Sequence, residues 1–330
     1  MQLILDTHGL VIRQRNRSFL IESKEQKRTI SPQKVSSIAV TADCLFSTAA
    51  LRLAAENKIP VYLVDESGEI DGKLYSPYFT GLAMQRKAQA IWVDSPDALQ
   101  WMLSLGIQKT QNQKSHLQKL ILSGNASQKV LDTIEILEAT TLRFQKEANR
   151  DDLDFDSVRQ RFFGLEGGAA RQYWQALSEM LPIEWKFENR SRRPALDPFN
   201  AALNYLYGML YPVVELAIFD ACLDPYIGVL HADEYDRPAL TFDCIEPFRA
   251  WADELLVALC KEGKLDIYCF DNKNEGWWLN KKGKAQLIPA FNTFLSTKRN
   301  DQGRTETVRN HIYIFAGQLA KKIMHWRQNH

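Results

Sequence analysis

The amino-terminal part of the chain consists of short apolar runs separated by turn signals such as His8-Gly9 and Ser31-Pro32. Short β-branched and apolar runs between turns are typical of β-strands. Strands are therefore predicted at Gln2 to Leu5, Leu10 to Arg13, Ser18 to Glu22, Val35 to Val40 and Val61 to Val64. The exception is Ser47 to Asn57, which is rich in helix formers and predicts one helix packed on the sheet.

From Ile91 onward the apolar residues recur every three or four positions, which is the spacing of one helix face. This period is lost between about Ser76 and Ile91, so the connection between two domains is placed there. We therefore predict an α+β protein. Residues 1–80 form a small β-rich domain, residues 81–90 a linker, and residues 91–330 a larger, mainly α-helical domain.

The clearest helix boundary of the second domain lies at Asp197-Pro198, because aspartate is a good N-cap and proline suits the first helical turn. The helix that follows has an apolar face. It also carries a second stripe of polar positions spaced three or four residues apart: Asn200, Asn204, Tyr207 and Tyr211. This stripe could face either solvent or a site.

Composition predicts a globular protein, since 45% of the 330 residues are hydrophobic and can fill a sizeable core. The chain has no run of about 18 uncharged apolar residues and no secretory signal, so we expect a cytoplasmic protein with no membrane partner. The five cysteines are odd in number and never form Cys-x-x-Cys, which argues against a disulfide framework or a structural zinc site.

The net charge of +1 argues against a uniformly basic nucleic-acid coat. Basic residues are nevertheless clustered, at Lys186, Arg190, Arg192 and Arg193, at Lys281, Lys282 and Lys284, and at Lys298, Arg299, Arg304 and Arg309. A protein that holds DNA along one face has this kind of charge distribution. Ordinary solvated faces would have it too, so charge alone does not decide between them.

Three ionisable residues stand inside apolar or glycine-containing stretches, where burial is costly unless the group is paired or bound to a metal. The first is Glu166, which precedes Gly167-Gly168 and an apolar helical stripe. It is expected near a helix start, where a negative charge is favourable by about 0.3 to 1 kcal/mol. The small residues beside it favour a site instead, because they permit close approach by a backbone or a ligand.

The second is His231, the first polar residue after the apolar run Ile227-Gly228-Val229-Leu230. A satisfied core histidine is one interpretation. The other is a metal ligand, since neutral imidazole is a common ligand and acidic residues follow within fifteen positions.

The third is Glu246, which lies three residues after Asp243 and so is expected on the same side of a helical turn. Two acids in a core segment need a compensating cation. Arg249 could supply it in a structural ion pair. A Mg²⁺ or Mn²⁺ ion is the alternative, because both prefer oxygen ligands and manganese tolerates imidazole best.

In their shared order, these residues resemble the CRISPR-associated integrase family, the first of the numbered CRISPR-associated proteins, which inserts new spacers into the CRISPR array. The resemblance covers nearly the whole chain and is carried by short motifs. They are Phe46 to Leu51, Ile59-Pro60-Val61 and Gly72-Lys73-Leu74, then Glu166-Gly167 with Ala170-Arg171 and Tyr173, Arg193 with Asp197, Asn200 and Tyr205, Asp224-Pro225, Gly228 to His231, and Asp243 to Arg249.

This resemblance implies a β-rich domain that dimerises and an α-helical catalytic domain that holds one Mg²⁺ or Mn²⁺ ion. Glu166, His231 and Glu246 would ligate the ion, and Asp243 would be a nearby auxiliary acid. The reaction would be attack of a DNA 3′-hydroxyl on a phosphodiester of the CRISPR repeat. The small second CRISPR-associated protein would join two dimers into an integration complex. Among the neighbouring basic residues we expect Lys186, Arg193, Arg249 and Lys298 to contact phosphates of double-stranded DNA.

Two other functions fit the same residues. One is a metal-dependent nuclease that acts on branched DNA repair intermediates. The other is a DNA-binding scaffold without catalysis, in which the three ionisable residues form a buried ion network.

Overall fold

The computed structural model describes residues 1–330 except 66–69, 77–82, 123–126, 151–153, 232–236 and 274–275. Its amino-terminal part is built of strands and one helix. They are β1 (Gln2–Leu5), β2 (Leu10–Arg15), β3 (Ser18–Glu22), β4 (Lys27–Ile30), β5 (Ser37–Val40), β6 (Cys44–Phe46), α1 (Thr48–Glu56), β7 (Val61–Val64) and β8 (Ile70–Leu74).

The strands form two small sheets, with the orders β1-β5-β7-β8 and β4-β3-β2-β6. Parallel pairs join β1 to β5 and β5 to β7, and antiparallel pairs join β2 to β3 and β3 to β4. Helix α1 begins at Ser47, whose hydroxyl accepts a hydrogen bond from the amide of Ala50 at 3.2 Å. It buries Ala50, Leu53 and Ala54 in the same apolar cluster as Ile12 and Ile38.

Each predicted strand and the predicted helix are present in this part, but β4, β6 and β8 were missed. All three lie at an edge of a sheet. An edge strand needs fewer buried residues than a central one, so its apolar pattern is weak. Strand β4, for example, buries only Ile30.

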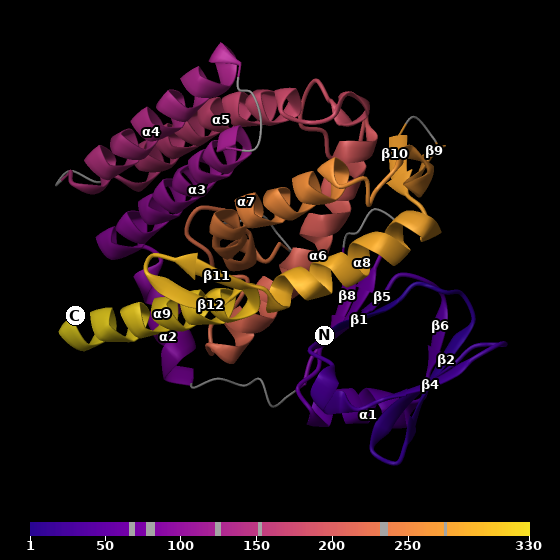
Figure 1. Cartoon of the computed structure of the whole chain (residues 1–330). Helices are drawn as coiled ribbons and strands as arrows, with labels where there is room; N and C mark the ends of the chain where they lie inside the picture. Colours follow the sequence, from indigo (N-terminus) through magenta and orange to yellow (C-terminus); the bar gives the residue numbers. More distant parts are fainter. Residues whose placement is uncertain (66–69, 77–82, 123–126, 151–153, 232–236, 274–275) are drawn as a thin grey trace.

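The larger part of the chain is helical, with two short hairpins. Its elements are α2 (Ala83–Trp92), α3 (Pro96–Leu122), α4 (Gln128–Ala148), α5 (Phe155–Glu179), α6 (Pro198–Asp220), α7 (Ala239–Lys261), β9 (Phe270–Lys273), β10 (Gly276–Leu279), α8 (Lys281–Ser296), β11 (Lys298–Asp301), β12 (Arg304–Thr307) and α9 (Val308–Asn329). Figure 1 shows α3, α4 and α5 side by side at one end, the sheets at the other, and α6, α7 and α8 between them. The protein therefore has the predicted α+β fold.

Helix α2 occupies most of the range predicted as a linker, of which residues 81–82 lie outside the described part. The apolar period is missing there because two glutamines occupy the buried face of α2. The side-chain amide of Gln85 donates to the carbonyl of Ala320, and that of Gln89 donates to the carbonyls of Asp224 and Ile227. These bonds satisfy the buried amides, so a helix without a clear apolar stripe can still pack against the core.

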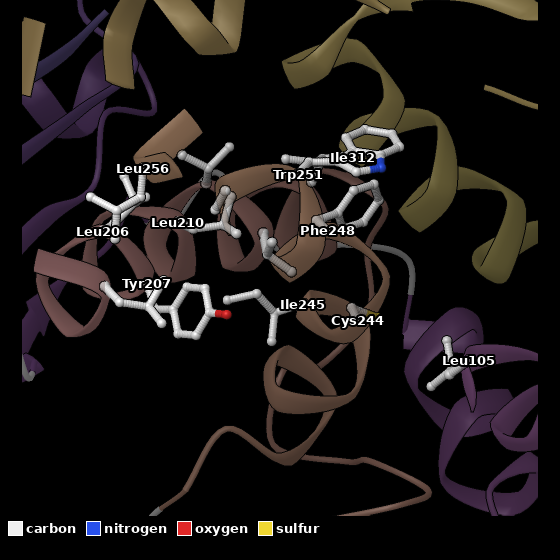
Figure 2. Packing of buried hydrophobic residues seen from close by; sticks show 14 of the residues in the cluster. Leu105, Leu206, Tyr207, Leu210, Cys244, Ile245, Phe248, Trp251, Leu256 and Ile312 are labelled. Carbon is white, nitrogen blue, oxygen red and sulfur yellow. The ribbon is translucent and has the colours of Figure 1, made fainter. Parts of the chain in front are cut away.

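The core of the helical part surrounds α6 and α7. Figure 2 shows Leu210 of α6 and Ile245 and Trp251 of α7 packed together with Ile312 of α9. Within the described residues, one helix, α6, is long and apolar enough to cross a membrane, but 78% of its apolar window is buried inside the protein. Its composition is therefore that of a core helix.

Polar contacts join the two parts of the chain. Glu215 of α6 is almost completely buried, and its carboxylate accepts hydrogen bonds from Lys73 Nζ at 2.6 Å and from the Tyr75 hydroxyl at 2.7 Å. The hydroxyl of Tyr62 in β7 donates to the carbonyl of Pro212 at 3.3 Å. These hydrogen bonds attach the sheet that contains β7 and β8 to α6, the central helix of the larger part.

Candidate metal centre

Glu166 lies in the middle of α5, so the prediction that it stands near a helix start is wrong. The helix begins eleven residues earlier, after Asp154, whose carboxylate accepts a hydrogen bond from the Ser157 amide at 3.0 Å. It continues through Gly164, Gly167 and Gly168, because its other face is buried against α3 and α4. A Cβ at any of these glycines would meet no neighbour within 4 Å, so the surface of α5 at these three positions is open.

A lysine that the sequence pattern did not single out contacts Glu166. Lys109 of α3 forms an ion pair with Oε1 of Glu166, and its side chain is only 13% exposed. The two helices approach closely one turn earlier, at Gly106, where a Cβ would lie 2.8 Å from the rings of Phe144 and Phe162. The glycine thus brings α3 near α5, and Lys109 reaches Glu166 one turn further along both helices.

Glu246 of α7 is 7% exposed and lies between two cations. Its Oε2 lies 2.6 Å from Lys109 Nζ, and its Oε1 lies 3.1 Å from a guanidinium nitrogen of Arg249. Burial opposes ionisation of this carboxyl, but Arg249 and Lys109 hold its pKa down at about 2. The ion pair with Arg249 that the sequence left open is therefore present, and a second cation joins it.

Arg249 is itself held inside the site. It donates to the hydroxyl of Tyr211 at 3.0 Å, and its Cζ lies over the ring of Tyr207, 5.0 Å from the ring centroid. Both tyrosines belong to the polar stripe of α6, so this part of the stripe faces the site. The other two members, Asn200 and Asn204, accept hydrogen bonds from Arg190.

Asp243 has a different role from Glu246, although both lie on α7. It is completely buried, and its Oδ2 accepts hydrogen bonds from the amides of Val229 and Leu230 at 2.7 and 3.1 Å. Its Oδ1 accepts from the amide of His231 at 3.1 Å and from the His231 ring at 2.8 Å. The backbone amides occupy the other acceptor positions of the carboxylate, so the His231 ring meets Oδ1 as a donor through Nδ1–H. In this tautomer the neutral ring keeps a lone pair on Nε2.

His231 is placed between the helices that carry the two glutamates. Its ring lies 6.2 Å from that of Phe163, one turn before Glu166, and 5.9 Å from that of Phe242, one turn before Glu246. The guanidinium of Arg159 in α5 also donates two hydrogen bonds to the carbonyl of Leu230, at 3.0 and 3.2 Å. The structure therefore brings Glu166, His231, Asp243 and Glu246 to one junction of α5, α7 and the segment before α7.

The residues of this junction fit a divalent ion by donor type. Carboxylate oxygens suit Mg²⁺ and Mn²⁺, and the lone pair on Nε2 adds a donor that manganese accepts. The two glutamates already hold one cation between them, the Lys109 ammonium. Among the residues that the structure describes, no three histidine, cysteine, aspartate or glutamate side chains stand together closely enough to hold an ion. Because the Lys109 ammonium lies between the two glutamates, an ion bonded to both of them would have to take its place.

A family model described as CRISPR associated protein Cas1 matches residues 3–293 of the chain. The chain belongs to the Cas1 family. It is 27% identical to CRISPR-associated endonuclease Cas1 1 of Archaeoglobus fulgidus, over 97% of this chain and 95% of that protein.

Two solved structures have the same fold. One is a casposase bound to its integration product, with a TM-score of 0.81 and 21% identity over 98% of this chain and 90% of that chain. The other is a chain of a Cas6-RT-Cas1–Cas2 complex, with a TM-score of 0.81 and 21% identity over 99% of this chain and 35% of that chain.

The four residues expected to contact DNA fall into two groups in this Cas1 chain. Lys186, Arg193 and Lys298 are exposed, as phosphate contacts must be. Arg249 differs from them because its side chain is 13% exposed and is engaged by Glu246, Tyr211 and Tyr207. Arg249 therefore lies inside the site as a partner of Glu246.

A buried polar chain lies behind the Cas1 site. Asp253 of α7 accepts hydrogen bonds from the hydroxyls of Tyr207 and Tyr173 at 2.6 and 2.9 Å, and Tyr173 in turn contacts His116 Nδ1 at 2.8 Å. Burial raises the pKa of Asp253 to about 7 and lowers that of His116 to about 4. Through Tyr207 this chain of hydrogen bonds also touches Arg249.

Lys109 is the main site residue that sequence reasoning missed. A lysine inside a helical segment is usually solvated, and nothing in the residues around it shows that this one is buried. The single signal is Gly106, because a glycine inside a long helix often marks a close approach by another element.

Proposed function

We propose that this protein is a divalent-metal-dependent DNA integrase and endonuclease that inserts new spacers into a CRISPR array. The observation that carries the proposal is the junction of two carboxylates and an imidazole: Glu166, Glu246 and His231 come from three segments far apart in sequence and are held there by buried partners. The name of the Archaeoglobus fulgidus relative and the fold shared with a DNA-bound casposase support it.

The chemistry is a transesterification. The 3′-hydroxyl oxygen of the incoming DNA forms a bond to phosphorus in the repeat. The existing P–O bond breaks and leaves a 3′-hydroxyl on the repeat strand, with one proton passed from the attacking to the leaving oxygen. A bound Mg²⁺ or Mn²⁺ ion would supply Lewis acidity toward the phosphoryl oxygens. Water in place of the hydroxyl would give hydrolysis, the endonuclease reaction.

The residues of the chain hold and orient the donors. Asp243 fixes the His231 ring by its Nδ1–H, so the Nε2 lone pair has one orientation. Arg249 neutralises Glu246 from the side opposite to Lys109, which keeps the carboxylate ionised in a buried position. Glu166 is the more exposed of the two glutamates, with 24% of its side chain accessible against 9% for Glu246.

DNA would approach from the open side of α5. The Glu166 side chain is accessible there, so a sugar-phosphate backbone can come near its carboxylate. The exposed Lys186, Arg193 and Lys298 would hold phosphates without reading sequence.

We also propose that the protein acts as a homodimer in a larger assembly with the small second CRISPR-associated protein. The amino-terminal sheets would form the dimer contact, as the family resemblance implies. A chain of the same fold in a Cas6-RT-Cas1–Cas2 complex supports the second partner.

The test is strand transfer of a duplex with 3′-hydroxyl ends into a repeat-containing plasmid with Mg²⁺ or Mn²⁺ and the small partner present. Wild type is compared with His231→Ala and with His325→Ala, a matched control on the exposed carboxy-terminal part of α9. We expect joined product from wild type and His325→Ala, and none from His231→Ala at equal DNA binding.

Other outcomes would replace the proposal. Cleavage of branched DNA without any joined product would favour a repair nuclease. DNA binding without any metal-dependent product from wild type would favour a scaffold in which the acidic and basic side chains form a structural ion network.

A further inference from the structure

Lys109 stands at the meeting point of the two glutamates. Its ammonium forms an ion pair with Oε1 of Glu166 and lies 2.6 Å from Oε2 of Glu246. Two carboxylates in a largely buried place repel each other unless a cation lies between them. Lys109 supplies that cation, and its side chain is only 13% exposed between the two glutamates.

An ion and this ammonium cannot occupy the site together. Divalent cations bind carboxylate oxygens at about 2.0 to 2.6 Å. The ammonium already lies 2.6 Å from the Glu246 oxygen and is paired with the Glu166 oxygen, so it fills the volume that an ion bonded to both oxygens would take.

Arg249 does not compete in the same way. It reaches the other oxygen of Glu246, Oε1, and is anchored by the Tyr211 hydroxyl and the Tyr207 ring. It can stay in place while Oε2 exchanges one cation for another. Lys109 has no such anchor in the contacts that the structure gives it, since both of its ion pairs go to the two glutamates.

We propose that Lys109 is a positioning residue that occupies the cation position of this site, holds Glu166 and Glu246 together before a divalent ion binds, and is displaced when the ion enters. The inference rests on the proposed function. It means that the two glutamates are held together before metal arrives, and that the ion binds against competition from a tethered ammonium.

The test is Mn²⁺ titration calorimetry of the full chain. Lys109→Met removes the charge and keeps much of the side-chain length, and Lys109→Arg keeps the charge. Lys114→Met is the matched control, because Lys114 lies on the same helix and pairs with Glu138 at the surface. His231→Ala reports on the metal site independently of Lys109.

Without its ammonium competitor, Lys109→Met should bind Mn²⁺ tenfold or more tightly than wild type, and its metal-free form should melt at a lower temperature. Lys109→Arg and Lys114→Met should bind Mn²⁺ as wild type does. Equal or weaker binding by Lys109→Met, with binding lost in His231→Ala, would overturn this inference and leave the proposed function standing. Absence of Mn²⁺ binding in wild type would overturn both.

A second measurement uses only the wild-type protein, in case Lys109→Met does not fold. Amine labelling followed by peptide mass spectrometry compares Lys109 with and without Mn²⁺, with Lys114 as the internal reference. We expect the labelling of Lys109 to rise on addition of Mn²⁺ while that of Lys114 stays constant. Labelling of Lys109 that does not change would show that the ammonium keeps its place and would overturn the inference.

Discussion

The ring of His231 donates a hydrogen bond from Nδ1 to Oδ1 of Asp243 over 2.8 Å, while the backbone amides of residues 229, 230 and 231 donate to the same carboxylate. Asp243 is thus both the acceptor that fixes the imidazole and the buried anchor of the segment that carries it. A carboxylate behind a histidine is a common arrangement at metal sites, because it fixes the ring and raises its basicity.

Replacing Asp243 by asparagine should weaken Mn²⁺ binding about 10- to 100-fold, since an amide holds the imidazole less firmly than a carboxylate. The variant should also lose about 1 to 3 kcal/mol of unfolding free energy, because one of its two former acceptor atoms becomes a donor facing buried amides. Calorimetric titration and urea unfolding measure the two effects. The exposed Asp94→Asn is the control. Unchanged Mn²⁺ affinity in Asp243→Asn would contradict the role given to this pair.

The same segment depends on Gly228. A Cβ there would lie 2.7 Å from the backbone carbon of Ala239 and 2.8 Å from the amide of Leu240, at the start of α7. Because these neighbours are backbone atoms, Gly228→Ala should push the segment away from α7 and draw the His231 ring off Asp243. We expect a loss of stability of about 1 to 3 kcal/mol together with weaker Mn²⁺ binding. Gly317→Ala, in open space on α9, should leave Mn²⁺ binding unchanged and raise stability by about 0.5 to 1 kcal/mol, because alanine is the better helix former.

Acid should destabilise the protein through His116. Burial lowers its pKa from 6.5 to about 4, so the unfolded chain takes up a proton between these pH values and the folded protein does not. Stability therefore falls as pH decreases from 6.5 to 4, by about 3 kcal/mol for this residue.

His116→Gln should remove that part of the pH dependence while an amide still reaches the Tyr173 hydroxyl. The pKa of Asp253 is raised, so its protonation changes stability in the opposite direction, and it does so in wild type and in His116→Gln alike. The difference between the two profiles of unfolding free energy against pH therefore measures the contribution of His116. If the unfolding free energies of wild type and His116→Gln change in parallel from pH 4 to 6.5, His116 is not a source of acid sensitivity.

Two of the arginines named for DNA contact should behave differently. Arg193 is exposed, so Arg193→Ala should lower the slope of log affinity against log salt by about 0.9 without a large change in stability. Arg249→Ala leaves Glu246 with one cation fewer in a buried place, and should cost about 3 to 5 kcal/mol of unfolding free energy. Filter binding at several salt concentrations and urea unfolding distinguish the two. Equal stability of both variants would place Arg249 among the surface contacts.

The fold could be predicted from sequence where one pattern dominated a segment. The central strands of the amino-terminal sheets and the helix capped by Asp197 fall where their patterns place them. Edge strands β4, β6 and β8 did not, because an edge strand does not need a continuous apolar face. Helix α2 could not be recognised from the apolar pattern, because Gln85 and Gln89 replace apolar residues on its buried side. Their hydrogen-bond partners are distant in sequence.

The candidate site could likewise be predicted only in part from the sequence. Glu166, His231 and Glu246 stood out because each is an ionisable residue in an apolar or glycine-containing stretch, and the structure brings all three to one junction. Lys109 did not stand out, because its burial depends on how closely α3 and α5 approach, and only Gly106 hints at that. The hydrogen bonds of Asp243 to three successive amides likewise require the fold.

The most direct test of the metal centre is anomalous diffraction at the manganese edge from crystals grown with Mn²⁺. We expect one anomalous peak per chain, from an ion bonded to carboxylate oxygens of Glu166 and Glu246 and to Nε2 of His231, with the Lys109 ammonium moved away. A map with no peak at this junction and with Lys109 still between the two glutamates would contradict the assignment.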